Sequence, residues 1–302
     1  MKRALKFTWR IITAPARGFI TLCRYVLRVI LTPFHKVRIF FTDTSQTTSN
    51  PLGEALGTVV KQPSSMMPHL LSMRKHIFRS ILAIVLFSTL AFAFIKPILS
   101  FLANPLPGGL DVLTAIDVTE NIGSVMKVAL LCGFAVSIPY VTLELYLFFA
   151  PAIKPASRLG SLIIIPFALV FFVAGMAFAY YVMLPTALPF LFNFMGLNTQ
   201  PRPSSYFNFI TAIMFWIGIF FEFPLVAYLL ARIGFLRPQT LIAQWRLAIV
   251  IMAVLAALIT PTVDPINMAL VMGPMMILYI IAILFTSIAQ NKRDKSQEKI
   301  LT

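Results

Sequence analysis

The sequence predicts an all-α integral membrane protein: six transmembrane helices form a cupped bundle, and both chain ends lie in the cytoplasm. Hydrophobic residues make up 59% of the 302-residue chain and charged residues only 12%, about half the usual quarter. The apolar residues form continuous runs and do not alternate with polar ones, which excludes a transmembrane β-barrel. Lysine and arginine gather in every second connection, and this asymmetry predicts the orientation.

Six apolar runs define the expected crossings. They cover residues 77–95, 125–149, 162–184, 206–230, 247–259 and 266–288. We expect a loop over residues 96–124, between the first two runs. The fifth run has only 13 residues, or roughly 20 Å of helix, against a hydrocarbon core of about 30 Å. It predicts either a partly inserted hairpin with the sixth run or a locally thinned bilayer.

Prolines inside the runs predict the shape of the bundle. A proline within a helix frees a backbone carbonyl and bends the axis. Such bends favour a curved, cupped wall over a straight bundle. The prolines concerned are Pro139, Pro166, Pro224 and Pro274.

The orientation follows from the basic residues. Thirteen of the 25 Lys and Arg residues lie at or before Arg79. The connections after the second and fourth runs, and the end of the chain, are also basic. The remaining connections carry mainly acids, among them Asp117 and Asp264. Positive charge marks the cytoplasmic side of short loops, so both ends are expected there.

The chain divides into four expected segments. Residues 1–42 carry nine basic residues and no acid, a pattern typical of a helix lying on anionic lipid. An organelle-targeting presequence or an undirected basic tail would show a similar composition. Residues 43–65 read as a flexible linker, 66–288 as the six-helix core, and 289–302 as a charged cytoplasmic tail.

One acid stands inside the fourth run. Glu222 is the only charged residue between positions 206 and 230, and a carboxylate in such a helix costs roughly 2.5 kcal/mol or more. It is either a protonated side chain bonded to a neighbouring helix or a polar spot in a protein-lined cavity. The second interpretation makes Glu222 a candidate functional residue.

Other chemistries find no support in the pattern. The two cysteines, Cys23 and Cys132, and the three histidines, His35, His69 and His76, form no metal-like or disulfide spacing. No nucleophile and base are paired near one interface, so we expect no enzyme activity. No nucleic-acid partner is expected.

Several motifs occur in a specific order along the chain. They are PHLLSMRK at 68–75, FAPA at 149–152, GMAFAYY at 175–181 followed by Pro185, FEFP at 221–224 and ITPTVDP at 259–265. In this order the chain resembles the TatC family, the multispanning core subunit of the twin-arginine (Sec-independent) protein translocase. The resemblance covers about residues 66–288.

The resemblance implies a six-helix, cupped receptor for folded cargo proteins carrying twin-arginine signal peptides. It also implies small single-span Tat partner subunits, an oligomer, the proton-motive force as energy source, no bound cofactor and a place in the bacterial inner membrane. An organelle membrane is the alternative if residues 1–42 are a presequence. The positions that match the family pattern are Arg74, Pro139, Pro151, Pro185, Pro224, Glu222 and Asp264.

The chain departs from the family at the expected signal-peptide site. Ser72, and Ser157 before Arg158, stand where the family has glutamates, and a hydroxyl cannot offer an arginine a bidentate ionic partner. A family glutamate in the last helix is replaced by Ile280. We therefore expect weakened signal recognition and a divergent copy. Glu144 is the nearest acid that could substitute, or it could make polar contacts between helices instead.

Two other functions compete with a translocase subunit. The first is an ion-coupled secondary transporter of small solutes centred on Glu222, although such transporters usually show related halves and none are evident here. The second is a non-transporting membrane scaffold that tethers partners or lipids through residues 1–42.

Overall fold

Every regular element is a helix in the described part of the computed structural model, which covers residues 67–301 apart from 107, 151–161, 163, 193–200 and 261–264. Five helical stretches are long and apolar enough to cross a membrane: 72–103, 119–149, 164–189, 203–233 and 268–291. A sixth apolar helix, Trp245–Ile259, is shorter. The predicted surface segment 1–42 and linker 43–65 lie outside the described residues.

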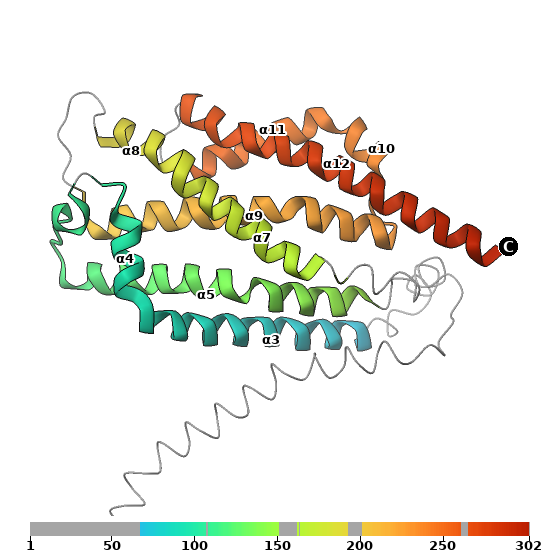
Figure 1. Cartoon of the computed structure of the whole chain (residues 1–302), viewed down its shortest axis with the longest axis horizontal. Helices are drawn as coiled ribbons and strands as arrows, with labels where there is room; N and C mark the ends of the chain where they lie inside the picture. Colours follow the sequence, from blue (N-terminus) through green and yellow to red (C-terminus); the bar gives the residue numbers. More distant parts are fainter. Residues whose placement is uncertain are drawn as a thin grey trace, which may run out of the picture.

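The helices follow one another as labelled in Figure 1. In chain order they are α3 (Met67–Ala91), η2 (Phe92–Phe94), α4 (Ile95–Ala103), η3 (Gly109–Val112), α5 (Val118–Phe149), α7 (Ile164–Phe178), the π-helical segment η5 (Ala179–Met183), α8 (Leu184–Phe192), α9 (Pro203–Ile233), α10 (Pro238–Ala243), α11 (Trp245–Ile259) and α12 (Pro265–Leu301).

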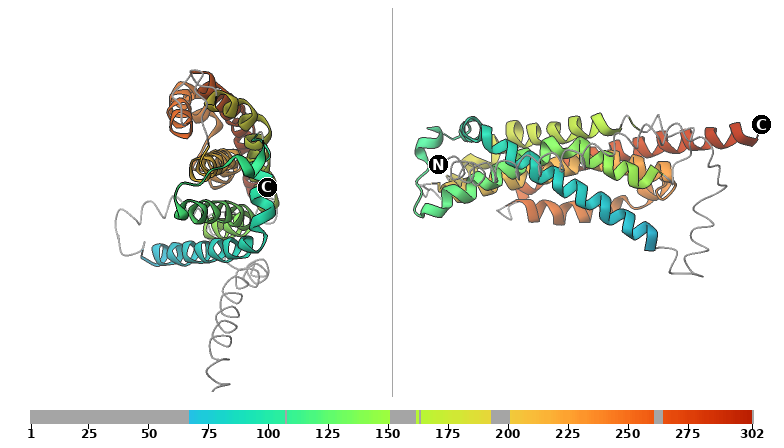
Figure 2. Two further views of the ribbon diagram at one scale, coloured as in Figure 1. Left: turned by 90° about the vertical axis from the view of Figure 1, so that its left-hand side faces the viewer. Right: turned by 90° about the horizontal axis from the view of Figure 1, so that it is seen from below.

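The long helices lie side by side and form a curved layer. α3 packs on α5, α5 packs on both α7 and α9, α9 packs on α12, and α12 packs on α11. Seen along the helices, this succession bends round without closing into a ring (Figure 2). α3 therefore occupies one edge and the α10–α11 pair the other. A curved wall is the shape predicted from the prolines, and Pro139, Pro224 and Pro274 do lie inside α5, α9 and α12.

The predicted loop over residues 96–124 is wrong. The first long helix is followed by a second helix, α4, which turns across one end of the bundle (Figure 1), and α5 already begins at Val118. α4 is apolar on one side, where Leu102 and Ala103 are buried. Sequence reasoning missed it because the Pro and Gly residues that follow it dominate the composition of the segment.

Two tyrosines fasten α4 to the bundle. The Tyr180 hydroxyl donates to the Phe101 carbonyl at 2.6 Å, and the Tyr206 hydroxyl donates to the Leu102 carbonyl at 2.8 Å. These carbonyls belong to the last turn of α4 (Ile95–Ala103), where backbone acceptors run out of i+4 donors; the Phe101 carbonyl also accepts from the backbone N–H of Asn104 at 3.2 Å. The tyrosines add side-chain donors at this helix end and tie α4 to the third and fourth apolar stretches.

The α7–α9 crossing depends on two glycines. A Cβ atom added at Gly175 would lie 2.9 Å from the Gly218 Cα and 2.9 Å from the Phe221 ring. A Cβ atom added at Gly218 would meet the ring of Phe172. Small residues let membrane helices approach closely enough for extensive van der Waals contact. Gly218 and Glu222 are one turn apart on α9, so this crossing also sets the surroundings of Glu222.

The last two apolar helices differ in length. α11 has 15 residues, or about 22 Å of helix, and its shortness agrees with the short fifth run of the sequence. α12 has 37 residues and continues to Leu301 without a break. The predicted boundary between core and tail at residue 288 is therefore not a change of secondary structure. The third stretch likewise continues beyond residue 184, through η5 and α8 to Phe192.

Candidate functional site

Glu144 and Glu222 are the acids that lie inside the long apolar stretches of the described chain beyond the first helical turn, which in α5 holds Glu120, and they lie in different surroundings. Glu144 is on α5, against α3, whereas Glu222 is on α9. Glu144 is enclosed by charged and polar partners. Glu222 has a carboxylate oxygen, Oε1, that is buried and has no hydrogen-bond partner among the described residues. The two acids therefore do not form one common site.

Glu144 is the centre of a buried ionic cluster. Its side chain is about 1% exposed, and one carboxylate oxygen lies 2.5 Å from His76 Nδ1. The Tyr140 hydroxyl donates to the other oxygen at 2.8 Å, and Arg79 Nη1 lies 3.9 Å from that oxygen. Burying a carboxylate is costly unless it is paired and hydrogen-bonded, and these three partners meet that need.

Helical spacing brings the four members of the Glu144 cluster together. His76 and Arg79 are three residues apart and Tyr140 and Glu144 four apart, so each pair lies on one face of its helix. The helix packing then places the faces of α3 and α5 against each other. The side chains of His76 and Arg79 remain 18% and 17% exposed, so they connect the buried Glu144 carboxylate to the surface of the helix pair.

The family-matched position Ser72 lies close to this cluster. It is one turn before His76 on α3, about 5–6 Å along the axis, and its residue is half-buried. Arg74 is exposed. Because the carboxylate of Glu144 is already engaged by three neighbours, it is poorly placed to receive the arginines of a signal peptide. The structure thus favours the alternative in which Glu144 makes polar contacts between helices.

Glu222 lies on the side of α9 that faces α7. It follows Gly218 by one turn, and its carboxylate interacts with the backbone of Phe172. Its neighbours Phe220 and Phe223 line a pocket against α10, α11 and α12, and Glu222 is not among the lining residues of that pocket. The carboxylate therefore packs against the α7 wall, with one oxygen unsatisfied by the described residues. A buried polar atom without a partner is a candidate for a functional role.

The remaining predicted site residues fall into two groups. Ser157, Arg158, Pro151 and Asp264 lie outside the described residues. Pro139 and Pro224 lie inside α5 and α9, and Pro185 is exposed in α8 directly after the π-helical segment. Because Ser157 is not among the described residues, the structure does not define its distance from Ser72.

Sequence reasoning missed three members of the Glu144 cluster: His76, Arg79 and Tyr140. The sequence does contain two polar pairs at helical spacing within apolar segments. His76 and Arg79 form the basic pair, three residues apart, and Tyr140 and Glu144 form the acidic pair, four residues apart. No rule of spacing links residues 68 positions apart in the chain. The sequence could therefore suggest that the basic and acidic pairs bind polar partners, but not that they bind each other.

Comparison with known proteins identifies similar chains. Residues 68–274 match the model of the family described as Sec-independent protein translocase protein (TatC). The Sec-independent protein translocase protein TatC of Carboxydothermus hydrogenoformans is 30% identical over 240 residues, which cover 79% of this chain and 99% of that protein. The chloroplastic TATC protein of Arabidopsis thaliana is 31% identical over 220 residues, covering 72% of this chain and 64% of the relative.

Solved structures show the same fold. The crystal structure of a twin-arginine translocase receptor, TatC, superposes with a TM-score of 0.62 at 28% identity and covers 73% of this chain and 99% of the solved chain. A second crystal structure of the receptor, in the detergent DDM, gives a TM-score of 0.65 at the same identity. The helical arrangement in Figure 1 is thus shared with these receptors.

Proposed function

The chain belongs to the TatC family of Sec-independent protein translocase proteins, and from this premise we propose how it works as the TatC subunit of a twin-arginine translocase. It serves as the core receptor that passes folded proteins across the bacterial inner membrane at the expense of the proton-motive force. Small single-span Tat subunits and twin-arginine signal peptides are its partners, and it acts as an oligomer. The match of family model and fold over most of the chain carries this proposal.

The receptor function is weakened in this chain. Ser72 and Ser157 replace the two carboxylates that the family pattern offers to the paired arginines. Glu144, the nearest described acid, is occupied by His76, Tyr140 and Arg79. This chain is therefore a divergent copy with low affinity for the signal, and residues 1–42 add binding to anionic lipid at the membrane surface.

The topology proposed has six crossings with both ends in the cytoplasm. In a variant without Cys23 and Cys132, a cysteine placed at Asp117 should react with an impermeant thiol reagent in intact cells, because the connection is expected to face outward. A cysteine placed near Asp264 should behave in the same way. A cysteine near Arg237 should react only after lysis, and its labelling in intact cells would contradict the orientation.

Glu222 supports transport in this proposal, and this can be tested in a strain without its own TatC. We expect the wild-type chain to restore at least partial export of a folded twin-arginine reporter. Glu222→Gln should keep the fold but reduce export, because Gln retains the shape and the polar atoms but can neither take up nor release a proton. Glu222→Leu should impair export at normal abundance. The measurement is exported reporter per membrane-inserted chain.

Asp111→Asn provides a matched control, since Asp111 is an exposed acid outside the apolar helices. Its export should equal that of the wild type. If Glu222→Leu exports fully, Glu222 is a tolerated core acid whose burial cost disappears on substitution. No rescue by the wild-type chain together with a substrate-dependent ion flux would instead support a secondary transporter.

A further inference from the structure

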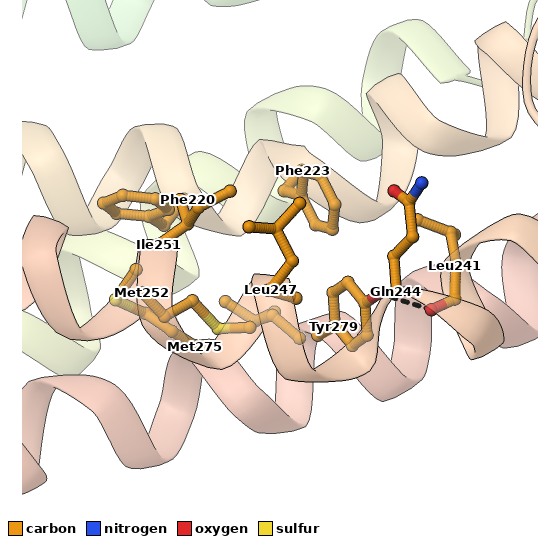
Figure 3. Close-up of a pocket in the computed structure, with 11 residues that line it drawn as sticks. Phe220, Phe223, Leu241, Gln244, Leu247, Ile251, Met252, Met275 and Tyr279 are labelled. Atoms are coloured by element: carbon orange, nitrogen blue, oxygen red, sulfur yellow. Dashed lines mark hydrogen bonds between the residues drawn. The ribbon is translucent and has the colours of Figure 1, made fainter.

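An apolar pocket of about 220 Å³ lies between α9, α10, α11 and α12. Figure 3 shows Phe220, Ile251 and Met252 at one end of the pocket and Leu241 and Gln244 at the other. It is larger than the dry cavities of about 150 Å³ that hold a benzene molecule. A narrow apolar chain fits a space of this size and lining.

The pocket opens sideways, toward the surroundings of the helices. Of its lining residues, Leu247 is 55% exposed, Ile251 49% and Phe223 37%. α11 is short and contacts α9 only weakly compared with its packing on α12. In a membrane this open side faces the acyl chains of the lipids. An occupant could therefore enter from the bilayer without crossing water.

One end of the pocket is polar. Gln244 lies there, and the Tyr279 hydroxyl donates to the Leu241 carbonyl at 2.6 Å (Figure 3). Trp245 follows Gln244, is 50% exposed and lies under the guanidinium of Arg246 at 5.6 Å from the ring centroid. Tryptophan at such a position is typical of the boundary between head groups and acyl chains.

Positive charge flanks the polar end, with no acid close to it in the sequence. Arg237 precedes α10 and Arg246 is the second residue of α11, and both are exposed. No aspartate or glutamate occurs in the sequence between positions 223 and 263. An occupant with an apolar chain and an anionic head group would thus meet complementary surfaces at both ends.

We propose that the pocket binds one acyl chain of an anionic phospholipid from the cytoplasmic leaflet, with its phosphate held by Arg237 and Arg246. A whole transmembrane helix, about 10–12 Å across with its side chains, is too wide to enter. The proposal rests on the proposed membrane orientation but not on transport activity. A failure of lipid binding is therefore distinguishable from a failure of export.

Trp245 supplies the reporter for the test. The full chain, with Trp9→Phe and Trp216→Phe to leave Trp245 as its only tryptophan, is placed in phosphatidylcholine vesicles. Two series of vesicles are compared. In one series a minor fraction of brominated phosphatidylglycerol is added, and in the other the same fraction of brominated phosphatidylcholine, each with bromine near the head-group end of one acyl chain. Brominated phosphatidylglycerol should quench Trp245 fluorescence at a roughly tenfold lower mole fraction than brominated phosphatidylcholine does. A tenfold preference corresponds to the binding free energy that one or two basic residues contribute at a membrane surface.

Two pairs of variants separate the contributions of head group and chain. Arg237→Gln with Arg246→Gln should remove the preference for phosphatidylglycerol. Ala248→Phe fills the pocket and should reduce quenching by both lipids, whereas Ala253→Phe, on the same helix but outside the lining, should not. Equal quenching by both lipids in the wild-type chain, or unchanged quenching in Ala248→Phe, would overturn the proposal.

Discussion

The double substitution Ser72→Glu with Ser157→Glu should raise the affinity of this chain for a twin-arginine peptide by about one to four powers of ten. It should also create a clear preference for arginine over lysine. A bidentate arginine–carboxylate contact is worth about 1.5–3 kcal/mol when partly desolvated, and an exposed one at most about 1 kcal/mol. Each 1.4 kcal/mol or so changes a dissociation constant tenfold.

Ser72 offers a favourable position for a new carboxylate. It is half-buried at the start of α3, beside the exposed Arg74, so a glutamate there would be partly desolvated yet accessible. Glu144, one turn deeper, is already engaged by its three partners. The wild-type chain should therefore bind the twin-arginine peptide weakly and hardly prefer it to a twin-lysine peptide.

Photo-crosslinking of both peptides to membranes containing each variant measures this preference. Ser72→Gln with Ser157→Gln is the matched control, because it adds the same bulk without charge and should leave crosslinking at the wild-type level. Strong, arginine-selective crosslinking to the wild-type chain would contradict the prediction. Glu144→Gln would then be the next variant to test.

Replacing His76 by leucine should destabilise the packing of α3 on α5 by about 3 kcal/mol, the scale for removing one partner from a buried ion pair. His76 makes the shortest contact of the cluster, 2.5 Å from the Glu144 carboxylate. Without it, a carboxylate that is about 1% exposed keeps only the Tyr140 hydroxyl and an arginine 3.9 Å away. Unfolding in mixed micelles, followed by circular dichroism, would measure the loss.

The double variant His76→Leu with Glu144→Gln tests whether the uncompensated charge is the cause. Removing that charge should recover most of the stability lost in His76→Leu, so the two effects should not add. Arg79→Gln should cost less than His76→Leu, because its contact is longer. If the double variant is as unstable as the sum of its parts, the packing of the His76 ring, which lies 6.1 Å from Phe148, explains the effect instead.

Much of the fold was predictable from local composition. The five long apolar stretches and the short Trp245–Ile259 helix agree with the six predicted runs, because hydropathy summed over one segment already decides whether it prefers lipid. The helix α4 was not predicted, since its burial depends on hydroxyl groups of Tyr180 and Tyr206 that come from distant helices. The π-helical turn at Ala179–Met183 had no predicted counterpart either.

The sequence by itself determined the class of protein, its apolar runs, its family, and the presence of Glu144 and Glu222 inside those runs. Each of these depends on residues close together in the chain. Only the tertiary structure decided that Glu144 is enclosed by His76, Arg79 and Tyr140, while an oxygen of Glu222 has no partner among the described residues. The physical reason is that a helix presents a full circle of faces, and the rotation and axial register of its neighbours select which side chains meet.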